Sequence, residues 1–162
     1  MMLGYFLMAR HVFFSFHYER DIWRASQVRN SWVTKGDGEA AGFWDAASWE
    51  AVKRRGKDAV EQWIRNQLDG TSVTVVLIGE ETANRPYVQY EIEQSWINGN
   101  GLIGVYIDKM EDSDGNVGTR GADPFVVMGY KGIRTYCYVN GDGYNNLGDW
   151  IEAAYKRAQN RE

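Results

Sequence analysis

Cysteine and histidine are nearly absent from this sequence, and their scarcity excludes several kinds of site. With Cys137 as its single cysteine, the chain cannot form an intrachain disulfide, and a reducing, cytoplasmic setting fits it best. Cys137 lies in an apolar and aromatic run, so we expect a small buried thiol in a strand rather than a catalytic one. The two histidines, His11 and His17, have no further ligands nearby at metal-binding spacing, and we therefore predict no metal site.

Basic charge is also sparse. The formal net charge is −4, and no dense basic stripe offers a face to a polyanion, which argues against nucleic acid as a partner. The richest basic run, residues 53–57, sits among helix-forming residues and is typical of a solvated helix face.

Long apolar runs are missing as well. The opening stretch, MMLGYFLMAR, is too short to span a bilayer and lacks both the basic region and the small-residue cleavage site of a signal peptide. We therefore expect no membrane partner. We interpret residues 1–9 as an N-terminal extension and residues 10–162 as a single domain.

What the sequence does contain is an ordinary globular composition with many aromatic rings. Hydrophobic residues make up 44% and charged residues 25% of the 162 positions, and no repeat or linker divides them. The 7 tryptophans and 10 tyrosines can fill a core, and they also provide flat surfaces on which a ring-bearing ligand could stack.

Apolar periodicity predicts alternating strands and helices. The expected strands are residues 11–16, 71–79, 102–108 and 133–139. The expected helices are residues 21–32, 57–68, 87–97 and 147–157. Because the second and third strands are almost continuously apolar, they should be buried on both faces, as in a parallel sheet. This alternation predicts an α/β fold with a central, mainly parallel sheet flanked by helices in three layers.

Two stretches fit this pattern poorly. Residues 34–49 are rich in glycine and alanine, and we expect a short strand within them at residues 42–45. Residues 109–132 are polar and glycine-rich over an unusual length, which predicts an excursion on the surface.

Two motifs match known ligand sites by letter but not by context. GNGLIG, residues 99–104, matches the dinucleotide pattern G-x-G-x-x-G, yet it follows a predicted helix and leads into a strand, the reverse of the required order. A helix end and a turn explain it better. Residues 112–123 space acidic side chains as in a calcium loop, but Val117 stands where that loop needs glycine, so we expect an acidic surface loop.

The most informative residues lie at the ends of two predicted strands. The segments are HVFFSFHYERD, residues 11–21, and NRPYVQYEIEQSW, residues 84–96. In open α/β sheets the ligand crevice forms at the carboxyl edge of the strands. If the first two predicted strands are neighbours in the sheet, Phe16 and His17 face the helix that begins near Pro86.

Within that helix, Glu91 falls at the margin of the apolar face, one turn after Tyr87. The residues expected to face the core are Val88, Ile92 and Ser95. A carboxylate at the margin should be partly desolvated, with an aromatic ring beside it. Spacing alone leaves two alternatives open: a catalytic carboxylate, or a solvated helix glutamate such as Glu93 is expected to be.

The same segments resemble TIR domains. HVFFSFHYERD is similar to the opening strand of that family, and Tyr87-Val88-x-x-Glu91-Ile92 resembles the aromatic-x-x-x-Glu motif that carries the catalytic glutamate of NAD-cleaving TIR enzymes. The likeness is strongest to the TIR-like proteins of bacterial Thoeris anti-phage systems. The further segments that carry it are RNSWVTK, GFWDAASWE, TSVTVVLIG and PYVQYEIEQS.

This resemblance implies a flavodoxin-like TIR fold and an enzyme that consumes NAD as a substrate, with no separate cofactor. It implies that the product is a cyclic ADP-ribose isomer, made after phage is sensed, and that this product activates a partner effector. Because many TIR active sites are completed by a neighbouring subunit, a homo-oligomer on activation is implied as well.

By position, the resemblance assigns the catalytic role to Glu91 and puts the aromatic Tyr87 one helical turn before it. It places the other substrate-binding residues at the floor of the cleft, namely Phe14, Ser15, Phe16 and His17. Many NAD-cleaving TIR domains have tryptophan where this chain has Tyr87, but tyrosine can still stack on a ring.

Two other classes of protein are alternatives. A TIR-like fold also serves as a non-catalytic interaction module, and the fold alone does not choose between module and enzyme. A receiver-like domain fits less well, because the first strand ends in Ser15-Phe16-His17 instead of an acidic cluster. A flavin-binding domain would need a glycine-rich phosphate loop after that strand, where His17-Tyr18-Glu19-Arg20 stands.

Overall fold

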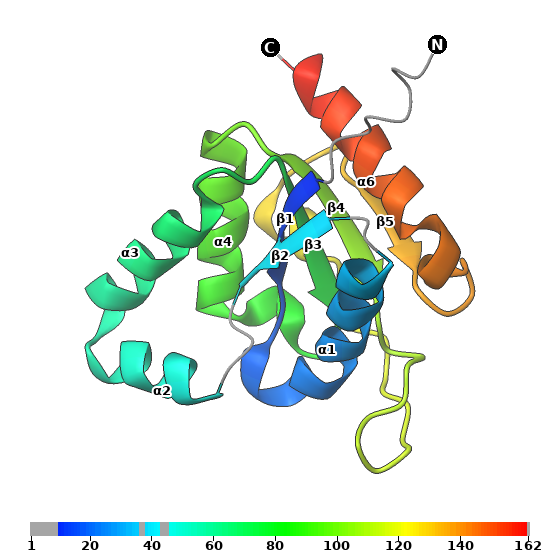
Figure 1. Cartoon of the computed structure of the whole chain (residues 1–162), viewed down its shortest axis with the longest axis horizontal. Coiled ribbons are helices and arrows are strands. Elements are labelled where there is room, and N and C mark those ends of the chain that lie inside the picture. Colours follow the sequence, from blue (N-terminus) through cyan, green and yellow to red (C-terminus); the bar gives the residue numbers. More distant parts are fainter. Residues whose placement is uncertain (1–9, 36–37, 43–45, 162) are drawn as a thin grey trace.

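A sheet of five parallel strands forms the centre of the described structure, in the spatial order β2-β1-β3-β4-β5 (Figure 1). This computed structural model describes residues 10–35, 38–42 and 46–161. The strands are β1 (Arg10–Ser15), β2 (Gly38–Ala41), β3 (Val73–Ile78), β4 (Gly101–Tyr106) and β5 (Arg134–Cys137). The predicted parallel sheet is confirmed, and β1 pairs with β3 as the sequence analysis required.

Helices cover both faces of this sheet. They are α1 (Tyr18–Thr34), α2 (Ala46–Arg54), α3 (Lys57–Leu68), α4 (Pro86–Ile97), α5 (Pro124–Met128) and α6 (Gly143–Gln159), with a 3-10 turn, η2 (Thr82–Asn84), before α4. α1 and α6 pack on one face, whereas α2, α3, α4 and α5 pack on the other (Figure 1). The predicted three-layer α/β arrangement is therefore confirmed.

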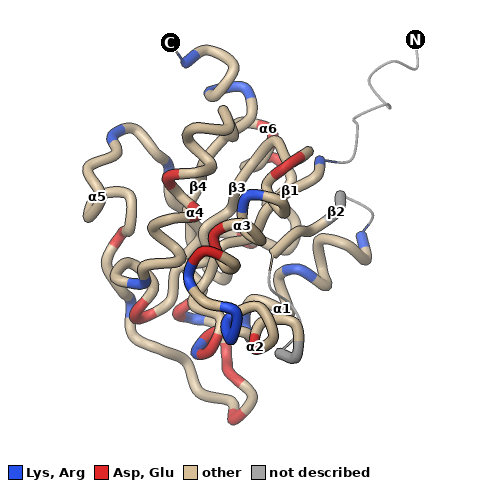
Figure 2. The backbone as a smooth tube through the Cα atoms, turned by 90° about the vertical axis from the view of Figure 1, so that its left-hand side faces the viewer, with Lys and Arg blue, Asp and Glu red and all other residues tan. Residues whose placement is uncertain are grey.

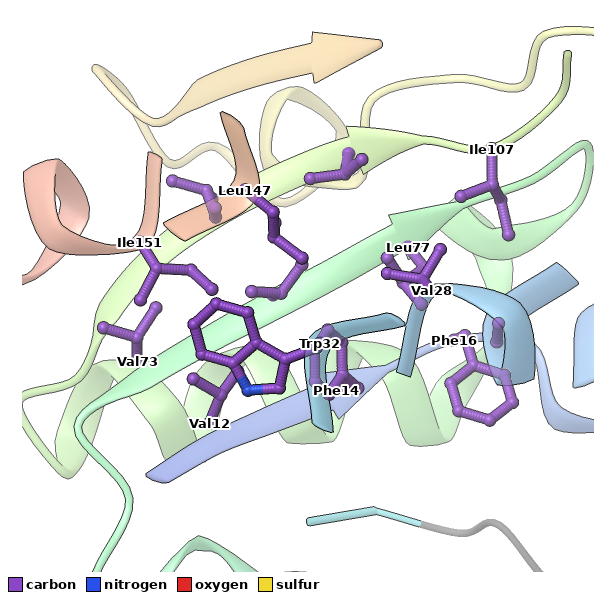
Figure 3. Packing of buried hydrophobic residues seen from close by; sticks show 14 of the residues in the cluster. Val12, Phe14, Phe16, Val28, Trp32, Val73, Leu77, Ile107, Leu147 and Ile151 are labelled. Carbon is purple, nitrogen blue, oxygen red and sulfur yellow. The ribbon is translucent and has the colours of Figure 1, made fainter. Parts of the chain in front are cut away.

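Large apolar side chains seal the face that α1 and α6 cover. Val12 and Phe14 lie two residues apart on β1, so both point to this face of the sheet. They belong to one buried cluster with Val28 and Trp32 of α1 (Figure 3). Ile151 of α6 completes the same cluster and is fully buried. Removal of this apolar surface from water is the main force that holds both helices on the sheet.

The alternate residues of β1 point to the opposite face. Phe13 packs in a cluster with Ile64 of α3, and Ser15 reaches Glu91 of α4. Ile92 of α4 fills a separate cluster with residues of β3 and β4. The alternation along β1 thus aims one polar side chain, at the last position of the strand, toward α4.

Element boundaries agree with the sequence analysis where apolar periodicity is strong. α3 has the predicted bounds, and α4 begins at Pro86, one residue earlier than expected. Of the strand expected at residues 42–45, Gly42 is not part of a strand but directly follows β2, which was not predicted. Gly42 has a φ of 132°, a conformation that favours glycine and that ends the strand. Residues 43–45 lie outside the described residues.

The segment 109–132 contains more structure than the sequence suggested. Asp123 accepts hydrogen bonds from the backbone N–H groups of Phe125 and Val126, which caps the short helix α5. Phe125 is buried against the sheet. The prediction of a surface excursion therefore holds for residues 111–120, which are largely exposed, and is wrong for α5.

Cys137 is half-buried, whereas a buried thiol was expected. The reason is that β5 is the edge strand of the sheet, so its residues are covered less completely than those of β3 and β4. The Arg120 guanidinium donates a hydrogen bond to Cys137 Sγ over 3.1 Å.

Two other features of the surface, the basic run and the turn at Gly99, agree with the sequence analysis. The basic run 53–57 lies at the exposed turn between α2 and α3 (Figure 2). Gly99, with a φ of 82°, follows the end of α4 as a turn residue. Among the described residues, no helix combines the length and the apolar character needed to cross a membrane. Residues 1–9, which we interpret as an extension, are outside the described part of the chain.

Substitution of Ile151 by alanine tests whether α6 is held by this core. Because Ile151 is fully buried, Ile151→Ala should lower the free energy of unfolding by roughly 2–5 kcal/mol. On the same helix Lys156 is exposed, and Lys156→Ala should change it by less than about 0.5 kcal/mol. Denaturant titrations followed by circular dichroism measure both, and equal losses in the two variants would contradict the packing described.

Candidate active site

A hollow opens at the carboxyl end of β1, between the first turns of α1 and α4. Its volume is about 460 Å³, the open space at its mouth included. β1 continues through α1 to β2 on one side, and β3 continues through α4 to β4 on the other. The neighbouring strands β1 and β3 therefore flank the point where the winding changes direction, which is where open α/β sheets bind ligands.

Glu91 lines this hollow from α4, and only 5% of it is exposed. Its Oε1 accepts a hydrogen bond from Ser15 Oγ over 2.6 Å. Burial raises the pKa of the carboxyl from 4.5 to about 8, and the Ser15 hydrogen bond opposes that rise only in part. A solvated helix glutamate is thus excluded for Glu91, while Glu93 on the same helix is exposed as expected.

Buried hydroxyl groups fix the position of α4 on the sheet. Ser95 donates a hydrogen bond to the backbone oxygen of Glu91 over 2.6 Å. The Ser95 Oγ also lies 2.6 Å from Thr74 Oγ1 of β3, and Asn100 donates to the same threonine over 3.1 Å. Since these buried groups satisfy one another, they favour a single placement of α4, and with it a single placement of the Glu91 side chain.

Aromatic rings form the walls of the hollow. The rings of Phe16 and Tyr18 lie 6.1 Å apart, centroid to centroid, and Tyr18 lies 5.4 Å from Trp49 of α2. Trp49 in turn meets the Tyr87 ring edge-on at 5.8 Å. These spacings are those of favourable aromatic pairs. The faces of such rings attract cations, so the walls suit a positively charged ring.

Sequence reasoning missed Tyr18 and Trp49. Tyr18 directly follows the predicted site residue His17, and this closeness was a signal that it shares the site. Trp49 lies in GFWDAASWE, one of the segments that carry the family resemblance, but nothing in that segment assigned it to the site, because it reaches the hollow through the packing of α2 beside α3. Its ring lies beside Tyr87. Many NAD-cleaving TIR domains have a tryptophan at the position of Tyr87 itself, so in this chain a tryptophan ring is present next to that position.

Polar groups surround the mouth of the hollow. His17 caps α1, since its Nδ1 accepts a hydrogen bond from the backbone N–H of Arg20 over 3.3 Å. Burial, and then the nearby Arg85 guanidinium, lowers the pKa of His17, so the ring is neutral at pH 7. Arg85 and Glu19 also line the hollow, with 3.9 Å between the guanidinium and the carboxylate.

The structure brings all of the predicted site residues together. Those that line the hollow are Phe14, Phe16, His17, Tyr87 and Glu91. Ser15 differs from the expectation, because it lies behind the carboxyl of Glu91 as its hydrogen-bond donor and is itself fully buried. Within residues 10–35, 38–42 and 46–161, no group of three or more His, Cys, Asp or Glu side chains is arranged to hold a metal ion.

Comparisons with known proteins identify the family. The model of the family described as "Thoeris protein ThsB, TIR-like domain" matches residues 13–112, a span that contains every residue lining the hollow. The chain belongs to this ThsB family. The resemblance to Thoeris TIR-like proteins that the sequence suggested is thereby confirmed, and the α/β sheet described above is the fold of this ThsB-family chain.

A protein from Bacillus cereus (strain MSX-D12) is similar to this ThsB-family chain. It is named "Putative cyclic ADP-D-ribose synthase ThsB1" and is 46% identical over 125 residues. The aligned part is 76% of this chain and 65% of the relative, so the chain spans just under two thirds of that relative's length.

The buried carboxyl should make the protein less stable as pH rises. Below pH 4.5 the carboxyl is protonated in both the folded and the unfolded state. Between 4.5 and about 8 the unfolded chain loses this proton while the folded protein keeps it, so the free energy of unfolding falls. Glu91→Gln removes this ionisation. The free energy of unfolding of the variant, relative to that of the parent, should therefore increase by roughly 2–4 kcal/mol from pH 5 to pH 8.5.

Denaturant titrations at several pH values measure this difference. Glu93→Gln is the matched control, because Glu93 is exposed on the same helix and should track the parent at every pH. If Glu91→Gln also tracks the parent across this range, the carboxyl is not held in the buried environment described here.

Proposed function

We propose that this ThsB-family chain cleaves NAD at the nicotinamide–ribose bond and forms a cyclic ADP-ribose isomer that serves as an anti-phage signal. The observation that carries the proposal is the buried carboxyl of Glu91 in a hollow walled by aromatic rings. The name of the Bacillus cereus relative, a cyclic ADP-D-ribose synthase, supports the same reaction.

The chemistry of the leaving group explains why one carboxylate can suffice. The bond that breaks joins C1′ of the ribose to N1 of a cationic pyridinium, and the electron pair leaves with nicotinamide, which becomes neutral. No general acid is needed, in contrast to most glycosidases, which use two carboxylates. Positive charge develops on the ribose, and in our proposal the ionised Glu91 stabilises that charge and holds the ribose hydroxyls.

The raised pKa of Glu91 fits this role. In the free protein the carboxyl is largely protonated near neutral pH, because burial disfavours its charge. Arrival of a cationic ring beside it would favour the ionised form and lower its pKa. The charge on Glu91 would then form where it is useful, next to the ribose, in a site of low dielectric that strengthens its effect.

The aromatic walls bear on the choice between cyclisation and hydrolysis. To form a cyclic product, a nucleophilic atom of the adenosine half must bond to C1′ before water does. Phe16, Tyr18, Trp49 and Tyr87 surround the hollow with apolar surface, which would exclude water and hold the rings in a reactive arrangement.

We propose further that activation proceeds through a homo-oligomer and that the product acts on a separate effector which senses the cyclic isomer. NAD is a substrate in this scheme, and no bound cofactor is required. A non-catalytic interaction module has no use for a buried carboxyl that lowers stability above pH 4.5, and this cost favours the enzyme.

Loss of nicotinamide release in Glu91→Gln is the test of the reaction. With NAD and lysate from phage-infected cells, the variant should release nicotinamide at least roughly 100-fold more slowly than the parent, because it cannot supply the negative charge. Glu93→Gln should retain the parent rate. Liquid chromatography with mass spectrometry measures nicotinamide and the cyclic product, and parent-like turnover by Glu91→Gln would refute the role of this residue.

The pH dependence of the reaction should follow the ionisation of Glu91. We expect kcat/KM for NAD to rise with pH to a midpoint near the free-protein pKa of about 8. Ser15→Ala removes the hydrogen bond that lowers this pKa, so its midpoint should lie at higher pH than that of the parent. A profile that is flat from pH 6 to pH 9, or a midpoint that Ser15→Ala leaves unchanged, would contradict this assignment.

A further inference from the structure

The mouth of the hollow carries a positive group that is only loosely paired. Arg85 lines the hollow, and its ion pair with Glu19 in the described structure spans 3.9 Å, the outer limit of such a contact. Glu19 is shared, because Lys53 of α2 lies 3.3 Å from its other carboxylate oxygen. The Arg85, Glu19 and Lys53 side chains are 43%, 48% and 42% exposed. Exposed pairs of this kind are weak, so an anionic ligand can displace Glu19 at little cost.

Two further features of this mouth offer hydrogen-bond donors, although the Glu81 carboxylate also acts electrostatically on His17. The Nδ1 atom of His17 already accepts from the Arg20 backbone, and in the neutral ring the proton is therefore on Nε2. α4 starts at Pro86 without a side-chain cap in the described residues, and its first residues line the hollow. Its uncapped backbone N–H groups and the positive end of its dipole lie at the same opening.

The hollow is therefore polarised from its interior to its mouth. The interior has aromatic rings and the carboxyl of Glu91, which suit a cationic ring and hydroxyl groups. The mouth has a guanidinium, an imidazole N–H and a helix start, which suit an anion. A ligand that matches both the interior and the mouth is a nucleoside with a cationic ring that is linked to a phosphate group.

We propose that Arg85, together with His17 and the start of α4, binds the diphosphate of the dinucleotide. In the free protein Glu19 forms an ion pair with Arg85, and the diphosphate takes the place of Glu19 when it binds. This inference rests on the proposed function for the identity of the substrate. The diphosphate is bonded through C5′ to the nicotinamide ribose, so its capture at the mouth turns C1′ inward to Glu91. Arg85 is thus a residue that positions the substrate.

Binding of ADP-ribose, which carries the diphosphate but no cleavable nicotinamide bond, tests this subsite in the full chain. Arg85→Gln should weaken ADP-ribose binding about tenfold in isothermal titration calorimetry, because a charged hydrogen bond is lost. Arg85→Lys should recover part of the loss. Glu19→Gln should act in the opposite direction and tighten binding roughly twofold to fivefold, because the competing carboxylate is gone.

The matched control is Arg134→Gln. Arg134 is the exposed first residue of β5, at the amino edge of the sheet and away from the hollow, so this variant should bind ADP-ribose as the parent does. The affinity of the parent should also fall with added salt, and the affinity of Arg85→Gln should fall less steeply. Parent-like affinity in Arg85→Gln, weaker binding in Glu19→Gln, or no ADP-ribose binding by the parent would each overturn the subsite.

Nicotinamide release from NAD, measured on the same proteins, keeps the two proposals separate. If the chain binds ADP-ribose through Arg85 but cleaves no NAD in infected-cell lysate, the subsite stands and the proposed function fails. If it cleaves NAD and Arg85→Gln leaves the KM for NAD unchanged, the reaction stands and the diphosphate subsite fails.

Discussion

A carboxyl group held out of water at the carboxyl end of β1 is the feature on which the site depends. Charge in such a place is costly, so the carboxyl of Glu91 is largely protonated near neutral pH. One short hydrogen bond, from Ser15, ties this carboxyl to the sheet. Under the proposed function, the lower stability above pH 4.5 is the cost of a group that becomes charged beside a cationic substrate, the usual relation between stability and activity.

The position of this carboxyl follows from ordinary strand and helix geometry. The two-residue period of β1 sends Val12 and Phe14 into one core and leaves Ser15 facing α4 on the other side. The 3.6-residue period of α4 turns Glu91 toward the same point while Ile92 fills the core. The hydrogen bonds of Ser95 to α4 and to Thr74 of β3 then fix the position of α4 on the sheet. As a result, β1 and α4 meet at the hydrogen bond between Ser15 and Glu91.

Much of this arrangement could be predicted from the sequence because its causes are local. The apolar periods of β1, β3, α3 and α4 predicted the parallel sheet and, from the ends of its strands, the edge at which the site forms. The same reasoning left Glu91 between two alternatives, since the spacing of one helix does not reveal what packs against it. The family resemblance favoured the catalytic alternative, and the burial of the side chain excludes the solvated one.

What the sequence could not give depends on contacts between distant segments. Trp49 enters the hollow only because α2 packs beside α3, and Arg85 meets Glu19 only because the starts of α1 and α4 converge. Local signals also failed to predict β2, because its small residues carry no clear apolar or β-branched pattern. β5 is an edge strand as well, but its aromatic run predicted a strand at residues 133–139.

The most direct measurement of the central claim is a titration of the Glu91 carboxyl by carbon-13 NMR. Protein labelled at the glutamate side-chain carboxyl carbon, with Glu91→Gln to assign the signal, gives this pKa without any need for turnover. We expect an apparent pKa near 8 in the free protein, and a lower value when a nicotinamide dinucleotide is bound. A pKa near 4.5 that ligand leaves unchanged would contradict the account, because Glu91 would then be an ordinary solvated carboxylate.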